Sequence, residues 1–467
     1  MSETHFHPEQ FSEAAKVATG NEYLQKVLHK ATFHSLGIRD SVVTDFPDWE
    51  QMRETAHLIR KHAIDHLDEL LIQLEENCTK NGVQVHYARN TNEARALILS
   101  LLQKQNAKRV VKSKSMTSEE IELNSFLEES GIEAVETDLG EYIVQLEGKP
   151  PSHITAPALH LSREQIGKLF HEHIGTDYTD DPETLTKQAR LILREKFLHA
   201  DAGVSGVNFA CADTGRLVVV ENEGNGRFCT SYPKLHIAVC GIEKVIAHEF
   251  YLAVLLRMLA RSATGQRFTT YTNFLAQPRR ANESDGPETM HLVLLDNGRS
   301  KILADVELRE SLLCIRCGAC LNVCPVYQHA GGHAYGSAYM GPIGAVLTPQ
   351  FKGYETTKSL PFASSLCGAC AEICPVKIPL PEHLLTLRQR IAEREKLRPG
   401  IERMGFAAWA NTMLNPSRYE RAGKFFTMIS KFGWNKFMPG WTPLRKPLNG
   451  ATISFRERWR RERGGKS

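Results

Sequence analysis

Seven cysteines between residues 314 and 375 have the type and spacing that metal binding requires. The first run reads Cys-x-x-Cys-x-x-Cys-x-x-x-Cys-Pro, and the second ends in Cys-x-x-Cys-x-x-x-Cys-Pro. A chain with the first spacing binds one [4Fe–4S] cluster through three thiolates and sends the fourth to another cluster. The pattern therefore predicts two iron–sulfur clusters. Their predicted ligands are Cys314, Cys317, Cys320 and Cys374 for the first cluster, and Cys324, Cys367 and Cys370 for the second.

The second cluster lacks one cysteine ligand. When the two runs are aligned on their Cys-Pro ends, the counterpart of Cys314 is Ser364. We expect two [4Fe–4S] clusters, but the second could also be [3Fe–4S], have a ligand that is not cysteine or that a partner donates, or keep one open iron. Zinc is the alternative to iron, since Cys-x-x-Cys pairs also bind zinc. A four-ligand zinc site has no need of seven cysteines in a crossed pattern.

The rest of the composition indicates a globular protein of a reducing compartment. The other four of the eleven cysteines are expected to be buried thiols, because iron-bound thiolates belong where disulfides do not form. The N-terminal residues lack the order of a secretory signal. The longest strongly apolar stretch, 251–260, contains Arg257 and is too short to span a bilayer. These features predict a cytoplasmic protein.

Charge and motif positions divide the chain into four predicted parts. The net charge is +3, but residues 401–467 carry fourteen Lys and Arg against four Glu, which leaves −7 for residues 1–400. A basic tail therefore follows an acidic body. The predicted parts are an N-terminal helical or irregular segment (1–60), an α/β domain (61–300), a helical ferredoxin-type domain (301–395) and a basic, aromatic C-terminal region (396–467).

Alternating strand and helix patterns predict the α/β domain. Apolar residues at helical spacing over 52–74 indicate one long helix, and strand-like stretches then alternate with helices. This order favours a largely parallel sheet, in which ligands bind where strands end and helices begin. The expected strands are 83–87, 109–111, 132–135 and 217–220. The expected helix starts are Thr117 to Glu120, Ser162 to Gln165 and Asp181-Pro182, with a glycine-rich turn opening the stretch 203–227.

Two loops of this domain contain candidate binding or catalytic residues. Lys112 and Lys114 follow a predicted strand and precede a helix, where they could bind a phosphate or carboxylate, although a solvated loop fits equally well. Glu221 and Glu223 lie in a glycine-rich loop after an apolar strand and could bind substrate or act as a general base. On spacing alone, simple turn chemistry is the favoured explanation for that loop.

With these motifs the chain resembles a known family. Residues 203–227 and the α/β order around them resemble the domain named for lactate utilisation (LUD), which would lie within residues 70–300. With the seven cysteines behind it, the chain resembles the lactate utilisation protein B family. The resemblance implies a sheet of the ribose-phosphate isomerase and CoA-transferase type, followed by a helical ferredoxin domain like those of succinate dehydrogenase and heterodisulfide reductase. That family shares the seven-cysteine pattern.

The resemblance also implies a function. Members of the family are iron–sulfur proteins of a three-protein system that oxidises L-lactate to pyruvate, so we expect an electron-carrying oxidoreductase subunit. The implied partners are a cysteine-rich protein and a second LUD-domain protein. Two alternatives stay open: the α/β domain is itself catalytic on a carboxylate or phosphate through Glu221, Glu223, Lys112 and Lys114, or the chain is a redox sensor that binds partners without turnover. No dinucleotide-binding Gly-x-Gly-x-x-Gly follows a strand.

The C-terminal region has a basic segment with an aromatic stripe. Docking to a partner or to the chain's own body is favoured over contact with a membrane surface, because three prolines interrupt any long interfacial helix. We expect no binding of nucleic acid, since the final basic run has no nucleic-acid-binding fold around it. The basic segment and its stripe comprise Lys424, Phe425, Phe426, Met428, Ile429, Lys431, Phe432, Trp434, Lys436 and Phe437, and the prolines are Pro439, Pro443 and Pro447.

Overall fold

A parallel sheet of six strands stands at the centre of the first of two structural units in the chain. The computed structural model describes residues 7–394, 397, 400–432, 446, 451 and 453–463. Internal contacts divide the chain into residues 1–395 and 396–467.

The strand order of the sheet confirms the expected parallel α/β domain. All neighbouring strands are parallel, and the interior strands β10 and β7 are buried almost throughout because both faces of the sheet are covered. In spatial order the strands are β1 (Gln84–Ala88), β10 (Thr289–Leu295), β7 (Leu235–Gly241), β4 (Ala202–Gly206), β2 (Arg109–Lys112) and β3 (Glu133–Glu136).

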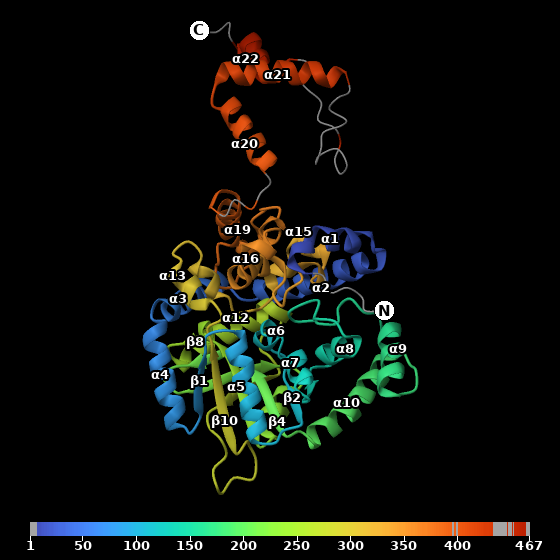
Figure 1. The fold of residues 1–467 in the computed structure, drawn as a ribbon, viewed down its shortest axis with the longest axis vertical. Helices are drawn as coiled ribbons and strands as arrows, with labels where there is room; N and C mark the ends of the chain where they lie inside the picture. The colour runs from blue at the N-terminus through green and yellow to red at the C-terminus, as the bar shows by residue number, and fades with distance from the viewer. Residues whose placement is uncertain are drawn as a thin grey trace. The chain divides into compact units, whose positions relative to one another are not determined.

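Helices and a second sheet cover the two faces (Figure 1). Helices α5 (Thr91–Lys104) and α7 (Leu123–Glu129) pack on one face. Helix α4 (Leu67–Lys80) packs on the other, together with a four-stranded sheet of order β8 (Val245–Ile246), β5 (Phe209–Cys211), β6 (Arg216–Glu221) and β9 (Tyr271–Leu275). Helices α8 (Leu139–Glu147), α9 (Arg163–Ile174) and α10 (Pro182–Leu198) pack beside β3.

Three sequence-based expectations about this domain were wrong. The long helix over 52–74 is two helices, α3 (Trp49–Asp65) and α4, which are separated at His66. Helix α6 (Met116–Glu120) is capped by the hydroxyl of Ser115 instead of Thr117, and it ends before α7 because Glu122 has a φ of 46°. The glycine-rich stretch from 203 is part of β4 and not a turn. Gly203 is needed there because a Cβ atom would lie 1.7 Å from the carbonyl oxygen of Cys229.

Two other helix starts are as predicted. Ser162 and Gln165 form a reciprocal capping box at α9. Asp181 caps α10, and Pro182 occupies its first position, where no N–H is required.

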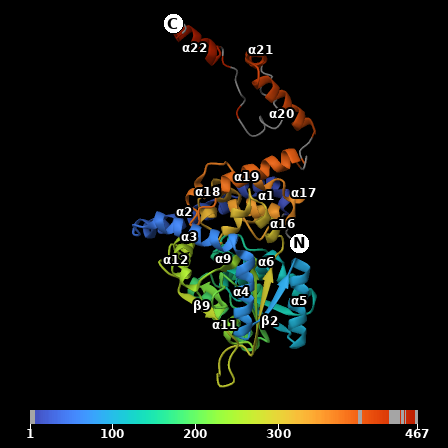
Figure 2. The same cartoon turned by 90° about the vertical axis from the view of Figure 1, so that its left-hand side faces the viewer.

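A helical layer lies against the edge of the sheet at which the parallel strands end (Figure 2). The N-terminal helices share one hydrophobic cluster with the cysteine-bearing helices, and the rings of Phe11 and Tyr335 are 5.1 Å apart. The first sixty residues therefore help to build the layer that positions the cysteines. Its helices are α1 (Phe11–Gly20), α2 (Glu22–Thr44), α3, α12 (Leu252–Thr264), α13 (Arg299–Ala304), α14 (Ala319–Asn322), α15 (Pro325–Ala330), α16 (Gly341–Lys352), α17 (Tyr354–Thr357), α18 (Ala369–Glu372) and α19 (Leu380–Gln389).

The second unit contains α20 (Gly400–Met413), α21 (Pro416–Lys431) and α22 (Phe455–Arg463). Large apolar side chains are exposed on each of these helices, among them Trp409, Phe425 and Trp459. Trp434, Lys436 and Phe437 of the predicted stripe, and all three prolines, lie outside the described residues. Over the residues that the structure describes, every helix is too short or too polar to cross a lipid bilayer.

Candidate metal centre

Short helices and tight turns of the helical layer hold the seven cysteines. The first run surrounds α14 and ends at the start of α15, and the second surrounds α18. Helices α14 and α18 contact one another, so the two runs lie side by side. Cys314 is half-buried and Cys367 is exposed. The other five thiols, Cys317, Cys320, Cys324, Cys370 and Cys374, are buried.

Electrostatic interactions place Cys374 with the first three cysteines. Burial raises the pKa of Cys320, and the neighbouring Cys314, Cys317 and Cys374 raise it further. Burial likewise raises the pKa of Cys374 to about 11, with Cys314 acting in the same direction. The end of the second run thus lies near the start of the first, in the arrangement that crossed ligation requires.

The remaining three cysteines interact with each other. Burial raises the pKa of Cys370 to about 12, and Cys324 and Cys367 raise it further. Cys367 differs from both, because an N–H of Ala369 and the hydroxyl of Ser365 lower its pKa. This group reaches the protein surface at Cys367, whereas the group of four is mostly enclosed.

Main-chain N–H groups point at the sulfur atoms of the first group. The N–H of Arg316 donates to Cys314 Sγ at 3.4 Å, and the N–H of Ile378 donates to Cys374 Sγ at 3.4 Å. Hydrogen bonds to the ligand sulfurs are one of the means by which proteins set the reduction potential of a cluster. The loops therefore offer both ligands and the polar environment that tunes them.

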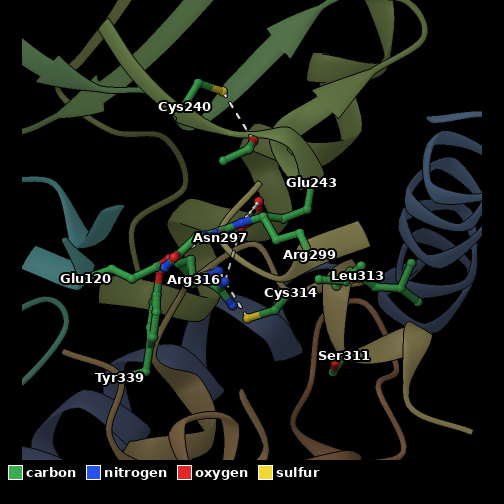
Figure 3. A network of polar contacts seen from close by, with 12 residues as sticks. Glu120, Cys240, Glu243, Asn297, Arg299, Ser311, Leu313, Cys314, Arg316 and Tyr339 are labelled. Carbon is green, nitrogen blue, oxygen red and sulfur yellow. Dashed lines mark hydrogen bonds and ion pairs between the residues drawn. The ribbon is translucent and has the colours of Figure 1, made fainter. Parts of the chain in front are cut away.

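Arg316 lies within the first cysteine run and is almost fully buried (Figure 3). Its guanidinium donates to Glu243 at 3.2 Å and stacks on the ring of Tyr339, 4.5 Å from the centroid. Among the described residues, its Nε and Nη1 atoms have no acceptor. Burial lowers the pKa of Arg316, but the charges of Cys314, Tyr339 and Glu243 outweigh that effect, so the net shift is upward.

These observations fit an iron–sulfur cluster at the first group. Burial disfavours the thiolate form of these cysteines, and binding to iron removes the thiol proton and partly neutralises the negative charge. Buried guanidinium donors without an acceptor call for an anionic acceptor, which a thiolate-ligated cluster provides. Among the described residues, no group of three or more His, Cys, Asp or Glu side chains is arranged to hold a single metal ion. Ligands of a cluster bind separate irons and do not have to converge on one ion.

The two candidate lysines of the α/β domain are occupied by carboxylates. Lys112 is fully buried and its Nζ lies 2.6 Å from Glu136 Oε1, while Lys114 Nζ lies 3.5 Å from Glu141 Oε1. Three carboxylates, those of Glu119, Glu136 and Glu141, surround these two lysines. An anionic ligand would therefore have to displace a carboxylate, and the predicted phosphate or carboxylate site at this loop stays a prediction.

The two candidate glutamates serve as local hydrogen-bond acceptors. Glu221 accepts N–H groups of Gly226 and Arg227 at 2.6 and 2.7 Å, at the start of α11 (Asn225–Ser231). Its Oε1 also accepts the side-chain amide of Asn273 at 2.8 Å. Glu223 accepts the N–H of Leu139 at 3.0 Å, at the start of α8. This geometry agrees with the turn-chemistry explanation, because each carboxylate satisfies a helix N-terminus.

The spacing of the cysteines does not indicate the arginines that support them. Arg53 and Arg60 lie on α3 and are buried, and Arg316 lies between the first two cysteines. The sequence does contain a sign that Arg53 and Arg60 are buried. Both recur at helical spacing with the apolar residues Ala56, Ile59 and Ala63, on a helix face where a solvated arginine is not expected. Arg316 is a charged residue inside a cluster-binding loop, which marks it as a residue close to the metal.

The chain is an iron–sulfur protein by class. It has a parallel α/β domain, which is followed by a helical layer with two cysteine runs that lie side by side. Residues 310–378 match the family model of the 4Fe-4S dicluster domain, and residues 71–295 match that of the LUD domain. The chain belongs to the lactate utilization protein B family, as its similarity to curated members establishes.

The similarity to these members extends over most of both chains. A lactate utilization protein B of Bacillus licheniformis is 49% identical over 418 residues, which cover 89% of this chain and 87% of that protein. The protein of the same name from Bacillus subtilis is 48% identical over 416 residues, with the same coverage. A solved DUF162 family protein from Deinococcus radiodurans matches 49% of this chain and 98% of its own at 15% identity, and its TM-score of 0.28 supports no conclusion.

Proposed function

We propose that the chain is the electron-transfer subunit of an assembly that oxidises L-lactate to pyruvate. Its partners in this proposal are a cysteine-rich protein and a second LUD-domain protein. The link to lactate comes from the names of its Bacillus relatives. The match of residues 310–378 to a dicluster domain supports electron transfer as the chemistry of this subunit.

The observation that carries the proposal is the division of the seven cysteines into an enclosed group and a surface group. Cys314, Cys317, Cys320 and Cys374 would hold the first cluster within the helical layer, and Cys324, Cys367 and Cys370 would hold the second at the surface. When bound, each cluster would accept one electron at a time, so two in series divide the electron pair that lactate loses. A carrier needs one site that a partner can approach, and exposed Cys367 meets that need.

The protein's own residues shape this relay. The N–H groups of Arg316 and Ile378 stabilise negative charge on Cys314 and Cys374, and the buried guanidinium of Arg316 adds a positive charge beside the same group. The apolar residues of the helical layer exclude water from the buried thiols. The hydrogen bonds and the guanidinium charge stabilise an added electron at the first group, whereas the exclusion of water opposes it.

The catalytic alternative for the α/β domain has a direct test. Because Glu221 and Glu223 accept main-chain N–H groups at helix starts, we expect Glu223→Gln to keep lactate-dependent reduction within about twofold of the unmodified chain. The measurement is the initial rate of cluster reduction in the reconstituted assembly. A loss of turnover with full iron content would move catalysis to this loop.

The experiment that tests the proposal is EPR spectroscopy of the anaerobic chain, alone and with its two partners, before and after L-lactate is added. The proposal predicts reduction of cluster signals only when the partners are present. Reduction in the isolated chain would place lactate oxidation within this chain. Absence of reduction in both samples would refute the proposal and favour a sensor.

A further inference from the structure

The second cysteine run repeats the backbone conformation of the first. Gly318 and Gly368 cap α14 and α18 with φ values of 78° and 89°. Arg316 and Leu366, each two residues before its glycine, have φ values of 60° and 56°. Residues other than glycine seldom adopt a positive φ. The positive φ of both Arg316 and Leu366, at matching positions, is therefore a specific structural match between the two loops. The two loops therefore place corresponding residues in corresponding positions.

Ser364 occupies the position that Cys314 has in the first loop. The N–H of Arg316 donates to Cys314 Sγ at 3.4 Å, and the N–H of Leu366 donates to Ser364 Oγ at 3.1 Å. The same main-chain donor thus points at the ligand atom in one loop and at the serine oxygen in the other. Arg388 Nη2 donates to the carbonyl of Ser364 at 2.8 Å, which holds the serine backbone in place.

We propose that Ser364 Oγ is the fourth protein ligand of the second cluster, which makes that cluster a site with three thiolates and one oxygen. This inference rests on the cysteine assignment proposed above. It depends on the match between the two loops and on the hydrogen bond from Leu366 to Ser364 Oγ. The neighbouring hydroxyl of Ser365 is not equivalent, since it interacts with Cys367.

Ligation requires the alkoxide form of the serine. The iron–oxygen bond forms as the hydroxyl proton leaves for solvent, in the same way that thiols lose their protons on binding a metal. The N–H of Leu366 already points at Oγ and would stabilise the negative charge that develops there. Exposed Cys367 lies three residues away, so solvent can accept the proton.

The test compares the iron content and EPR signals of four anaerobically purified chains: unmodified, Ser364→Ala, Ser364→Cys and Ser359→Ala. The unmodified chain and Ser364→Cys should both contain about eight irons, four for each cluster. Ser364→Ala should lose about one iron and show the signal of an oxidised three-iron cluster. Ser359→Ala is the matched control, because the hydroxyl of Ser359 donates to the carbonyl of Pro8 at 2.9 Å, and it should keep about eight irons.

Several results would overturn the inference. Equal iron content and spectra in the unmodified chain and in Ser364→Ala would show that the serine does not bind iron. The unmodified chain could instead contain about seven irons. A rise to about eight in Ser364→Cys would then show that one iron of the second cluster has no protein ligand, and a rise to about eight only when the partners are added would show that a partner supplies the ligand.

Cys367→Ala distinguishes a failure of this inference from a failure of the cysteine assignment. If Cys367→Ala leaves the second cluster intact, the cysteine assignment itself is wrong. If Cys367→Ala loses the second cluster and Ser364→Ala has no effect, only the serine ligand is refuted.

Discussion

Arg53 donates two hydrogen bonds to the main-chain carbonyl of Cys374, at 3.0 Å from Nε and 2.9 Å from Nη2, across 321 positions of sequence. Seven residues further along α3, Arg60 donates to the carbonyl of Leu313 at 3.2 Å, immediately before Cys314. Residues seven apart lie on the same face of a helix. One face of α3 therefore joins the end of the second cysteine run to the start of the first.

This arrangement leads to a prediction about Cys374. Because it lies with the first group, Cys374→Ser should disrupt the first cluster and leave the second, although Cys374 belongs to the second run. EPR and iron analysis would measure both clusters, and Cys367→Ser would serve as the matched variant that disrupts only the second. Selective loss of the second cluster in Cys374→Ser would refute crossed ligation.

The arginine at position 60 should be critical for stability. Its guanidinium donates to four main-chain carbonyls, those of Leu312, Leu313, Glu243 and Val245, and it is almost fully buried. Arg60→Met keeps much of the side-chain volume but leaves these carbonyls without a donor. We expect it to lower the free energy of unfolding by roughly 3–5 kcal/mol, as measured by chemical denaturation.

The control for that variant is Arg216→Met. Arg216 lies at the exposed start of β6 and pairs with Glu249 at 2.8 Å. Surface ion pairs contribute little, so this change should stay within about 0.5 kcal/mol of the unmodified chain. Equal losses in both variants would show that the network around Arg60 has no special role.

Arg316 should raise the reduction potential of the first cluster. A buried positive charge stabilises the more negative, reduced state, and Arg316 is both buried and hydrogen-bonded through its N–H to Cys314. Arg316→Gln should therefore make the first cluster harder to reduce by at least about tenfold in its equilibrium ratio, or about 59 mV for one electron. Arg316→Lys should recover part of this change. The measurement is an EPR-monitored redox titration.

Selectivity separates this effect from a general loss of structure. The potential of the second cluster should be unchanged in Arg316→Gln, because the groups that interact with Cys324, Cys367 and Cys370 do not include Arg316. A parallel shift of both clusters, or no shift in the first, would contradict the assigned role.

The sequence was sufficient to predict the parallel sheet and the family, because both depend on local patterns. Strands such as β1 and β2 have short strand-like patterns, and helix starts such as Asp181-Pro182 are chemical signals within a few residues. The spacing of the cysteines also led to the crossed assignment, since that rule is local in each run. Where residues close together in the sequence determine the conformation, the sequence pattern is enough to predict it.

The supporting contacts could not be predicted, because they join distant segments. Nothing near Lys112 in the sequence indicates that it forms an ion pair with Glu136 of the next strand. Nothing near Arg53 indicates that it donates to the carbonyl of Cys374. The break at His66 is likewise set by tertiary packing, since α3 contacts the cysteine region and α4 contacts the sheet. Helical periodicity continues through that residue and gives no sign of the change in partner.

Glu141 should make stability depend on pH. It is almost fully buried at the start of α8, and burial raises its pKa to about 8 despite the nearby charge of Lys114. The folded protein then holds a proton that the unfolded chain has lost above its ordinary pKa of 4.5. Where the folded state binds more protons, stability falls as pH rises, so this contribution is lost between pH 4.5 and about 8.

Glu141→Gln removes the titrating group and should flatten that dependence. Between about pH 6 and 8, a single proton accounts for a slope of up to about 1.4 kcal/mol per pH unit, and the variant should lose less stability than the unmodified chain over this range. Thermal unfolding at several pH values measures the slope. Glu129→Gln, at an exposed carboxylate at the end of α7, should show the slope of the unmodified chain. A steeper fall in Glu141→Gln would mean that the carboxylate is ionised in the folded state and that its pairing with Lys114 outweighs its burial.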